Sequence, residues 1–221
     1  MPTPANVLSF VRNQIAESAA DFYTDSEIYG YMSQAELEVV KRLKCNIVYD
    51  ASNVSGIGTR EYSKPTGYIS AYRITYDSLK LKKIDFNQFD MAEGTGYGFT
   101  GSTGSPEYYA DYGDENYIAL SPIPNVAGKT IAIWYLKEPD AITDASGDLT
   151  IPSDFGYYLA DYCLFRMYFK DDQVDKANAH IDLWNENLKK MEKEYKQRKG
   201  GDSYRTVKDV NAYPSTDMGI I

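Results

Sequence analysis

The chain has few of the side chains that most enzymes use for chemistry. It holds one histidine and two cysteines in 221 residues, and 23 Lys+Arg stand against 32 Asp+Glu, a formal net charge of −9. These numbers exclude a disulfide framework and a four-ligand zinc site. The acidic balance argues against a surface that holds nucleic acid by its phosphates. The sequence contains no run of about 18 apolar residues, so no membrane span is predicted. The first ten residues do not resemble a secretory signal.

Tyrosine, in contrast, is abundant. The chain has 21 tyrosines against 8 phenylalanines and 2 tryptophans. Tyr buries a large ring and keeps a polar tip, so it suits surfaces that are wet before assembly and buried after it. It also packs well on the faces of β-sheets. The two interpretations are compatible, and both stay open.

The N-terminal residues show helical periodicity. Thr3 and Pro4 predict a helix from Pro4 to about Ser18. Thr24 and Glu27 fit a capping box, which predicts the start of a second helix. Its apolar positions recur every three or four residues, at Ile28, Tyr31, Ala35, Val39 and Leu43.

Helical periodicity returns after residue 151. A first helix carries a bulky stripe, predicted to face the core, at Phe155, Leu159, Tyr162, Phe165 and Phe169. Residues 170–173 indicate a tight turn with an Asp cap. A longer helix then extends to Gly200, with apolar positions at Val174, Ala177, Ile181, Trp184, Leu188, Met191 and Tyr195. Lysines and arginines fill its last two turns and complement the helix dipole.

Between the helices the apolar pattern alternates with a period of two. The predicted strands cover residues 68–76, 79–82, 117–120 and 130–136. In the first of them, Tyr72, Ile74 and Tyr76 are expected on one face, with Arg73 and Thr75 on the other. Short strands at this spacing favour a small antiparallel sandwich or barrel.

The predicted fold class is α+β. A discontinuous helical domain, residues 1–45 and 151–199, packs the N-terminal helix pair against the C-terminal pair as a bundle. An antiparallel β-sandwich or barrel-like domain, residues 46–138, is inserted between them, and residues 139–150 form a linker. Residues 200–221 are either a frayed terminus or an extended arm that orders on a partner. The arm interpretation depends on apolar anchors at Tyr204, Val207, Val210, Tyr213, Ile220 and Ile221.

Two polar motifs are weak candidates for chemistry. The glycine-rich segment 94–104 resembles a phosphate loop, but no Lys or Arg occurs between residues 84 and 128, so a flexible loop is predicted. The acids at Asp140, Asp144, Asp148 and Asp154 lack the ligand order of a calcium loop. Those at Asp171, Asp172 and Asp175 are interpreted as a helix cap and first-turn charges.

The few nucleophilic and basic side chains have structural interpretations. His180 lies beside Ile181 and Trp184 on the long helix, and no Ser or Cys is recognisably tied to it as a nucleophile. Cys45 and Cys163 are interpreted as small buried thiols. Free thiols are consistent with a reducing compartment. We therefore predict no catalytic residue, no cofactor and no metal, and a protein that is not an enzyme.

Several segments, taken in order, resemble the head-to-tail adaptor (connector) family of short-tailed phages. They are similar to the family's segments Y-x-x-P … I-x-x-V, G-x-P-x-Y, I-x-L-x-P-x-P and I-P-x-x-F. In this chain the segments are Tyr62-Ser63-Lys64-Pro65 with residues 69–77, then residues 104–109, 117–124, 131–136 and 151–155. The likeness covers roughly residues 7–195, and the glycine-rich insertion at 94–104 departs from it.

The resemblance implies a structural virion protein of the neck, assembled in the host cytoplasm. Such proteins form a twelve-fold ring that joins the portal protein to the tail or nozzle protein and lets DNA pass without specific binding. No membrane partner is implied. The acidic charge agrees with this role, because negative walls repel the duplex and keep it mobile. The six apolar anchors of residues 202–221 are then the candidate portal-binding residues.

Two other functions stay open. A virion module that binds carbohydrate or a cell surface would use the aromatic faces and acids of the β segment, although it does not need the long helical pair and the arm. A glycosidic or muralytic tail-associated enzyme would need a pair of carboxylates about 5–9 Å apart, which a sequence alone does not place.

Overall fold

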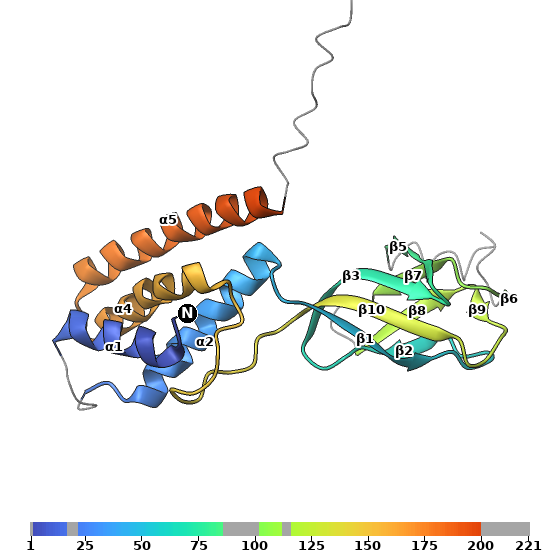
Figure 1. Ribbon diagram of the computed structural model, residues 1–221, viewed down its shortest axis with the longest axis horizontal. Helices are drawn as coiled ribbons and strands as arrows, with labels where there is room; N and C mark the ends of the chain where they lie inside the picture. Colours follow the sequence, from blue (N-terminus) through green and yellow to red (C-terminus); the bar gives the residue numbers. More distant parts are fainter. Residues whose placement is uncertain (1, 17–21, 86–101, 112–115, 200–221) are drawn as a thin grey trace, which may run out of the picture.

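The structure is a computed structural model in which residues 2–16, 22–85, 102–111 and 116–199 are described. Figure 1 shows a helical part at one end of the long axis and a β part at the other. The chain enters the β part after residue 43 and leaves it after residue 137. The predicted mixed α+β class is therefore confirmed.

Helix α1 (Pro4–Ile15) begins at the predicted cap. The Asn6 N–H donates to the Thr3 hydroxyl oxygen at 3.4 Å, and the Thr3 N–H donates to the Asn6 side-chain oxygen at 3.0 Å. These two bonds satisfy donors that the first turn would otherwise leave unpaired. The helix ends before the predicted Ser18, because Ala16 adopts a left-handed conformation with φ of 56°.

Helix α2 (Asp25–Leu43) also begins where predicted, but its capping box is only half formed. The Thr24 hydroxyl accepts from the Glu27 N–H at 3.2 Å. The Glu27 carboxylate does not return to the cap, since it binds Lys170 and Tyr31 instead. The capping-box prediction is therefore correct for Thr24 and wrong for Glu27.

The C-terminal helices comprise a 3-10 turn, η1 (Ser153–Tyr158), then α4 (Leu159–Lys170) and α5 (Val174–Arg198). The turn between α4 and α5 is present, but the predicted Asp cap is wrong. Gln173 occupies the N-cap position of α5 and makes no side-chain capping bond. The Asp171 carboxylate accepts from the Gln173 side-chain amide, so it is not available to the helix.

The apolar stripe predicted for α4 is only partly the core face. Phe155 and Leu159 are fully buried, whereas Tyr162 and Phe165 are half-buried and Phe169 is 61% exposed. The buried face of α4 consists instead of Leu159, Ala160, Cys163, Leu164 and Met167. Because α4 packs against α1, α2 and α5, close approach on three sides favours the smaller side chains.

Helices from both ends of the chain share one apolar core. Its fully buried members include Val7 and Val11 of α1, Met32 and Val39 of α2, and Trp184 of α5. Leu136 of the last strand belongs to the same core. The end of that strand is therefore anchored in the helical part.

The β part contains ten short strands in the described residues. They are β1 (Ile47–Val54), β2 (Glu61–Ser63), β3 (Tyr68–Tyr76), β4 (Leu79–Lys80), β5 (Lys82–Ile84), β6 (Thr103–Gly104), β7 (Tyr108–Asp111), β8 (Tyr117–Ser121), β9 (Ile123–Pro124) and β10 (Thr130–Lys137). Two four-stranded sheets have the orders β1-β10-β3-β4 and β2-β8-β7-β5, and β6 pairs with β9. The described strands form no closed barrel.

Strand pairing departs from the antiparallel prediction at two places. The pairs β5–β7 and β6–β9 are parallel, whereas the other pairs are antiparallel. The predicted strand 79–82 is also split at Leu81, where the chain leaves the first sheet and enters the second. Leu81 is buried and Leu79 is exposed, so the alternation predicted across 79–82 is interrupted.

Both sheets contribute to a second apolar core. It contains Ile74 and Ile131 from the first sheet and Tyr109, Ile118 and Leu120 from the second. This cluster shares no buried residue with the helical core. The β part therefore buries its own apolar faces.

Strand β3 has the predicted bounds, and its predicted faces are correct for Ile74 and Tyr76 but wrong for Tyr72. Arg73 pairs with Trp134 and Ala71 pairs with Tyr135, so Tyr72 is the extra residue of a β-bulge. Ile74 is buried as expected, whereas Tyr72 is 71% exposed. The bulge reverses the alternation at Tyr72, which explains why the period-of-two prediction is wrong there.

Residues 139–150 form no helix or strand, yet they are bonded to α2. The Ile142 N–H donates to the Ser33 hydroxyl oxygen at 2.8 Å. The Glu36 carboxylate, only 1% exposed as a residue, accepts from the backbone N–H groups of Thr150 and Ile151. Residues 139–150 are therefore hydrogen-bonded to α2 near both of their ends.

Candidate functional site

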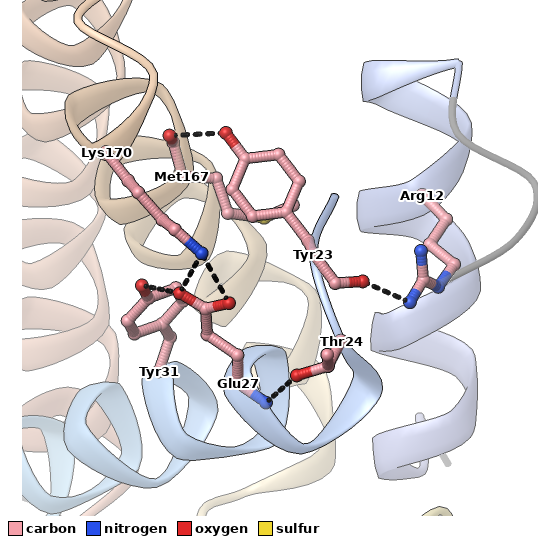
Figure 2. A network of polar contacts seen from close by, with 7 residues as sticks. All are labelled: Arg12, Tyr23, Thr24, Glu27, Tyr31, Met167 and Lys170. Carbon is pink, nitrogen blue, oxygen red and sulfur yellow. Dashed lines mark hydrogen bonds and ion pairs between the residues drawn. The ribbon is translucent and has the colours of Figure 1, made fainter. Parts of the chain in front are cut away.

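A polar network holds the beginning of α2 between α1 and α4. The Arg12 guanidinium donates to the Tyr23 carbonyl at 3.0 Å and also pairs with Asp25. The Tyr23 hydroxyl donates to the Met167 carbonyl at 2.6 Å. Figure 2 shows Tyr23, which precedes α2, bonded to Arg12 of α1 on one side and to Met167 of α4 on the other. Buried polar groups of this kind rigidify a fold only when each is bonded, as here.

The same network extends to Glu27, Tyr31 and Lys170. The Lys170 ammonium lies 2.8 Å from the Glu27 carboxylate, and this bond holds the pKa of Glu27 below its ordinary value despite partial burial. The Tyr31 hydroxyl donates to Glu27 at 2.7 Å. Burial, together with the Glu27 charge, raises the pKa of Tyr31 to about 12, so this hydroxyl stays protonated at neutral pH. The network stabilises the fold and presents no reactive group.

Aromatic rings lie on the surface of α4 beside α5. The Tyr162 ring contacts Trp184 with centroids 5.4 Å apart, and Phe165 lies 6.0 Å from Tyr162 and 6.1 Å from Phe169. These are the rings that the sequence assigned to the core. Tyr162 and Phe165 are half-buried, and Phe169 is exposed just before the α4–α5 turn, which lies at the left in Figure 1. The signal for this aromatic surface in the sequence is a second apolar line on α4 beside the buried one.

His180 of α5 contacts two side chains of α4. Its Nδ1 is 3.4 Å from the Asp161 carboxylate, and its ring stacks on Tyr168 with centroids 5.5 Å apart. Asp161 also accepts from the Asn187 amide at 2.9 Å. No hydroxyl or thiol contacts the imidazole among the contacts of the described residues. The sequence-based interpretation of His180 as structural fits this environment.

The two cysteines are separate and free. Burial raises the pKa of Cys45 to about 11, and complete burial raises the pKa of Cys163 further. Both thiols are therefore protonated and weak nucleophiles at neutral pH. Within the described ranges, no three His, Cys, Asp or Glu side chains come close enough to hold a metal ion. The helices of these ranges include none that could span a membrane.

The carboxylate of Asp111 in β7 is bonded both to the turn before β3 and to β3 itself. The Lys64 ammonium is 2.8 Å from the Asp111 carboxylate, and the Tyr68 hydroxyl donates to the same carboxylate at 2.7 Å. Burial acts to raise the pKa of Asp111, but the bonds from Lys64 and Tyr68 outweigh it and hold the pKa below its ordinary value. Burial and this carboxylate raise the pKa of Tyr68. Lys64 follows β2 and Tyr68 begins β3, so their bonds to Asp111 fix the turn between these two strands.

The outer face of the first sheet carries an aromatic group with a cation. The rings of Tyr49 and Trp134 lie 4.8 Å apart, and the Arg73 guanidinium lies 4.7 Å from the Trp134 ring. Next to them is a hollow of about 410 Å³ that reaches Thr75 and Asp77. This surface contains no member of the sequence-predicted site. Its signal in the sequence is the alternation of strands β1 and β10.

The tip of the β part is apolar. Val54, Ile57 and Val126 are all exposed there, and the loops that carry them are tied by the bond from the Ser55 hydroxyl to the Val126 carbonyl at 2.8 Å. A surface of this kind suits contact with another protein.

The portal-binding residues that the sequence predicts all lie outside the described residues. They are Tyr204, Val207, Val210, Tyr213, Ile220 and Ile221. The glycine-rich loop also lies outside them from residue 94 to residue 101. The acids considered for calcium are spread out: Asp140 pairs with Lys137, Asp144 binds Ser146, and Asp154 pairs with Arg198.

In the described residues, exposed aromatic and apolar side chains lie on several helices and strands, whereas His180 and the two cysteines are partly or fully buried. The sequence model of the family described as SU10 adaptor protein matches residues 5–208 of the chain. The protein therefore belongs to the SU10 adaptor protein family, and the predicted resemblance to a phage head-to-tail adaptor family is confirmed. A comparison with curated proteins found no match.

Family membership makes the protein a structural adaptor of a phage. It implies a place in the neck of the virion and contacts with other head or tail proteins. The family is structural and not typically enzymatic.

Proposed function

We propose that the protein is the head-to-tail adaptor that forms a ring between the portal protein and the tail or nozzle protein, and that DNA passes through this ring. The observation that carries the proposal is the family match over residues 5–208. The ring consists of identical copies, twelve by resemblance, and is assembled in the host cytoplasm. A closed ring of one protein needs a heterologous contact, in which two different surfaces of each copy meet.

The subunit consists of two domains, which suits a protein that contacts one partner on each side. The helical domain comprises residues 1–45 and 151–199, the β domain comprises residues 46–138, and residues 139–150 link them. The separate apolar cores of the two parts support this division. One part can then hold the portal while the other meets the tail. The arm, residues 200–221, continues from the end of α5 and binds the portal through its six apolar anchors.

The charge of the protein suits passage of DNA without specific binding. Each phosphate that a protein neutralises adds affinity for the duplex. A ring of subunits that each carry a net charge of −9 repels the duplex over its surface as a whole. A duplex inside such a ring stays mobile.

The direct test uses the purified protein and the portal protein encoded by the same phage. The two are mixed and the product is imaged by electron microscopy with class averaging. We expect the class averages to show one added layer of density on the portal, and we expect this layer to have rotational symmetry. A mixture in which the portal stays bare, although both proteins are folded, would contradict it.

Carbohydrate binding at the virion surface is a second candidate, favoured by one observation. The hollow beside Tyr49 and Trp134 combines one exposed and one half-buried aromatic ring with the polar side chains of Arg73 and Asp77. Sugars stack on such rings and bond to such groups. A glycan array with the wild type and with Trp134→Ala tests it, and binding that is absent or equal in both proteins removes this candidate.

A further inference from the structure

Helix α5 is a rod with charge of opposite sign at its two ends. Its N-terminal end follows the acidic turn of Asp171 and Asp172 and carries Asp175 in its first turn. Its C-terminal end carries a group of cations, namely Lys189, Lys190, Lys193, Lys196, Arg198 and Lys199. The helix has 25 residues. At a rise of about 1.5 Å per residue, the two ends are about 37 Å apart.

The end of α2 enlarges the basic end. The Lys199 ammonium donates to the Lys44 carbonyl at 3.3 Å, and Arg42 lies 3.4 Å from the Glu192 carboxylate. The C-termini of two helices therefore meet, and the cations of α2 join those of α5. Figure 1 places both ends on the side of the helical part that faces the β part. We call this surface the basic end; its α2 members are Lys41, Arg42 and Lys44.

Much of the charge of the basic end is not neutralised within the subunit. Glu192 pairs with Arg42 and Lys196, and Asp154 pairs with Arg198. Across the described residues, no ion pair forms at Lys41, Lys189 or Lys193, which are all exposed. An uncompensated cluster of cations is unexpected in a chain whose net charge is −9. These cations complement the dipoles of the two helices, and those without an ion pair can also pair with an anionic surface of another molecule.

The opposite end of the helical part is apolar as well as acidic. Phe169 and Val174 flank the α4–α5 turn, and both are more than half exposed. Around them, Asp172 and Asp175 form no ion pair within the described residues, Lys170 is already held by Glu27, and the one further cation, Lys176, lies 5.1 Å from the Tyr168 ring. Exposed apolar side chains with a charged rim are typical of a protein–protein contact. We call this surface the apolar-acidic end.

The basic end has matching aromatic groups. Tyr157 and Phe10 are exposed side by side with ring centroids 5.9 Å apart. The adjacent rings of Phe155 and Tyr158 contact Arg198 and Lys190 of the basic end. Phe155 is buried, but the half-buried Tyr158 and its exposed neighbour Tyr157 therefore lie next to cations of the basic end, whose charge is opposite to that of the other end.

We propose that successive copies of the chain meet head to tail in the ring, with the apolar-acidic end of one copy docked on the basic end of the next. The inference rests on the proposed ring, and it names the two surfaces that close it. Opposite ends of one rigid helix meet the requirement of a heterologous contact, because each copy carries both halves. Charge complementarity of this kind fixes the register and speeds association.

The choice of a second copy over DNA follows from the pair of surfaces. DNA phosphates would cover the cations but would leave Phe169, Val174 and the acids at the other end without a partner. A second copy accounts for both ends at once. It also removes the cations from the channel, where they would otherwise hold the duplex.

Charge reversal at one end at a time tests the contact. The acidic-end variant is Asp172→Lys with Asp175→Lys, and the basic-end variant is Lys189→Glu with Lys193→Glu. Each alone places like charges in the contact, so we expect the yield of rings on the portal to fall about tenfold or more. A control with the same change of charge, Lys80→Glu with Lys83→Glu on the β part, is expected to form rings at the wild-type yield.

Rescue makes the test specific. A mixture of the two reversal variants restores attraction at both kinds of junction, so rings are expected to return. The chain with all four substitutions carries exchanged ends and is also expected to form rings alone. Each variant is first shown to keep the wild-type melting temperature. Normal rings from the acidic-end variant, or no rescue in the mixture and in the exchanged chain, overturns the inference.

Two further measurements distinguish a failure of the head-to-tail contact from a failure of the proposed ring and from DNA binding. If wild-type protein leaves the portal bare, the proposed ring fails. Carbodiimide cross-linking of mixed light and ¹⁵N-labelled protein at high concentration then decides the contact, because intermolecular links from Asp172 or Asp175 to Lys189 or Lys193 support it and their absence overturns it. If only the basic-end variant is affected, and it also loses retention of a short DNA duplex, the basic end binds phosphate and the head-to-tail contact is wrong.

Discussion

The Tyr23 hydroxyl donates a 2.6 Å hydrogen bond to the Met167 carbonyl, so a residue just before α2 is fixed to the last turn of α4. The two residues are separated by 144 positions in the chain. The Tyr23 carbonyl also accepts from Arg12. This one residue therefore joins three helices from both ends of the sequence.

Replacing this residue tests how much the junction contributes. The Met167 carbonyl also accepts from the Asp171 N–H at 3.1 Å, so Tyr23→Phe does not leave it without a donor. We expect Tyr23→Phe to lower the free energy of unfolding by about 0.5–1.5 kcal/mol. Tyr23→Ala also empties a buried ring position and is expected to cost about 3–5 kcal/mol. Urea unfolding followed by circular dichroism measures both losses. No loss with Tyr23→Phe would contradict the contribution of the hydroxyl, and equal losses would contradict that of the ring.

Glu36 gives a prediction about pH. Burial raises the pKa of this carboxyl above its ordinary value, although the Thr150 and Ile151 N–H groups oppose the shift. The folded protein thus holds this proton to a higher pH than the unfolded chain, where the pKa of Glu is about 4.3. Between the two values the folded state binds more protons, so the stabilisation is complete below the unfolded pKa and declines as the pH rises through the folded pKa.

The substitution Glu36→Gln removes this titration and keeps an oxygen that accepts from the Thr150 N–H. We expect the difference in unfolding free energy between Gln variant and wild type to grow in favour of the variant as the pH rises from about 4. Glu36→Ala also removes the acceptor and is expected to be less stable than the Gln variant by about 1–3 kcal/mol at every pH. Urea unfolding at a series of pH values measures how the unfolding free energy of the wild type and of each variant changes with pH. A pH-independent difference between wild type and Gln variant contradicts the raised pKa.

The sequence predicts the elements better than it predicts their faces. Helix starts at Thr3 and Thr24 are marked by local capping chemistry, and the bounds of β3 follow from its alternation. Neither signal marks the bulge at Tyr72, because the extra residue depends on the register with Trp134 and Tyr135 of a distant strand. Pairing across 60 or so positions is set by tertiary packing, which a local pattern does not contain.

The same limit explains the surface of α4. The helix has two apolar lines, and the bulkier line was assigned to the core. The structure buries the line of Cys163, Leu164 and Met167 instead, because three neighbouring helices approach it closely. Phe165 and Phe169 are therefore left at the edge where the proposed contact lies. A sequence shows that α4 has two apolar lines, but only the packing decides which one is covered.

His180→Gln tests the structural interpretation of the only imidazole. Gln still reaches the Asp161 carboxylate, while the stacking on Tyr168 is lost. We expect a loss of no more than about 1 kcal/mol in unfolding free energy and phage that remain infectious. Trp184→Ala serves as the contrast, since Trp184 is buried in the helical core and its removal is expected to cost about 3–5 kcal/mol. Phage that assemble normally but lose all infectivity with His180→Gln would count strongly against the structural role.

Deleting residues 200–221 tests the proposed arm. Burial of each large apolar anchor contributes roughly 1.5–3 kcal/mol. Ordering about 20 residues costs about 1–2 kcal/mol each in backbone entropy, which is more than the anchors at Tyr204, Val207, Val210, Tyr213, Ile220 and Ile221 offset. Backbone hydrogen bonds to the portal, for example by strand addition, must supply the difference.

The helical and β parts bury their own apolar cores in the described residues, so the fold has no evident need of the arm. We therefore expect the deletion to leave the melting temperature nearly unchanged and to weaken portal attachment severely, as measured by co-sedimentation with the portal. A variant with Tyr204→Ser, Val207→Ser and Val210→Ser keeps the length of the arm and separates its anchors from its backbone; it is expected to attach with intermediate strength. A markedly lower melting temperature after deletion, or attachment at the wild-type level, would show that these residues are not a portal-binding arm.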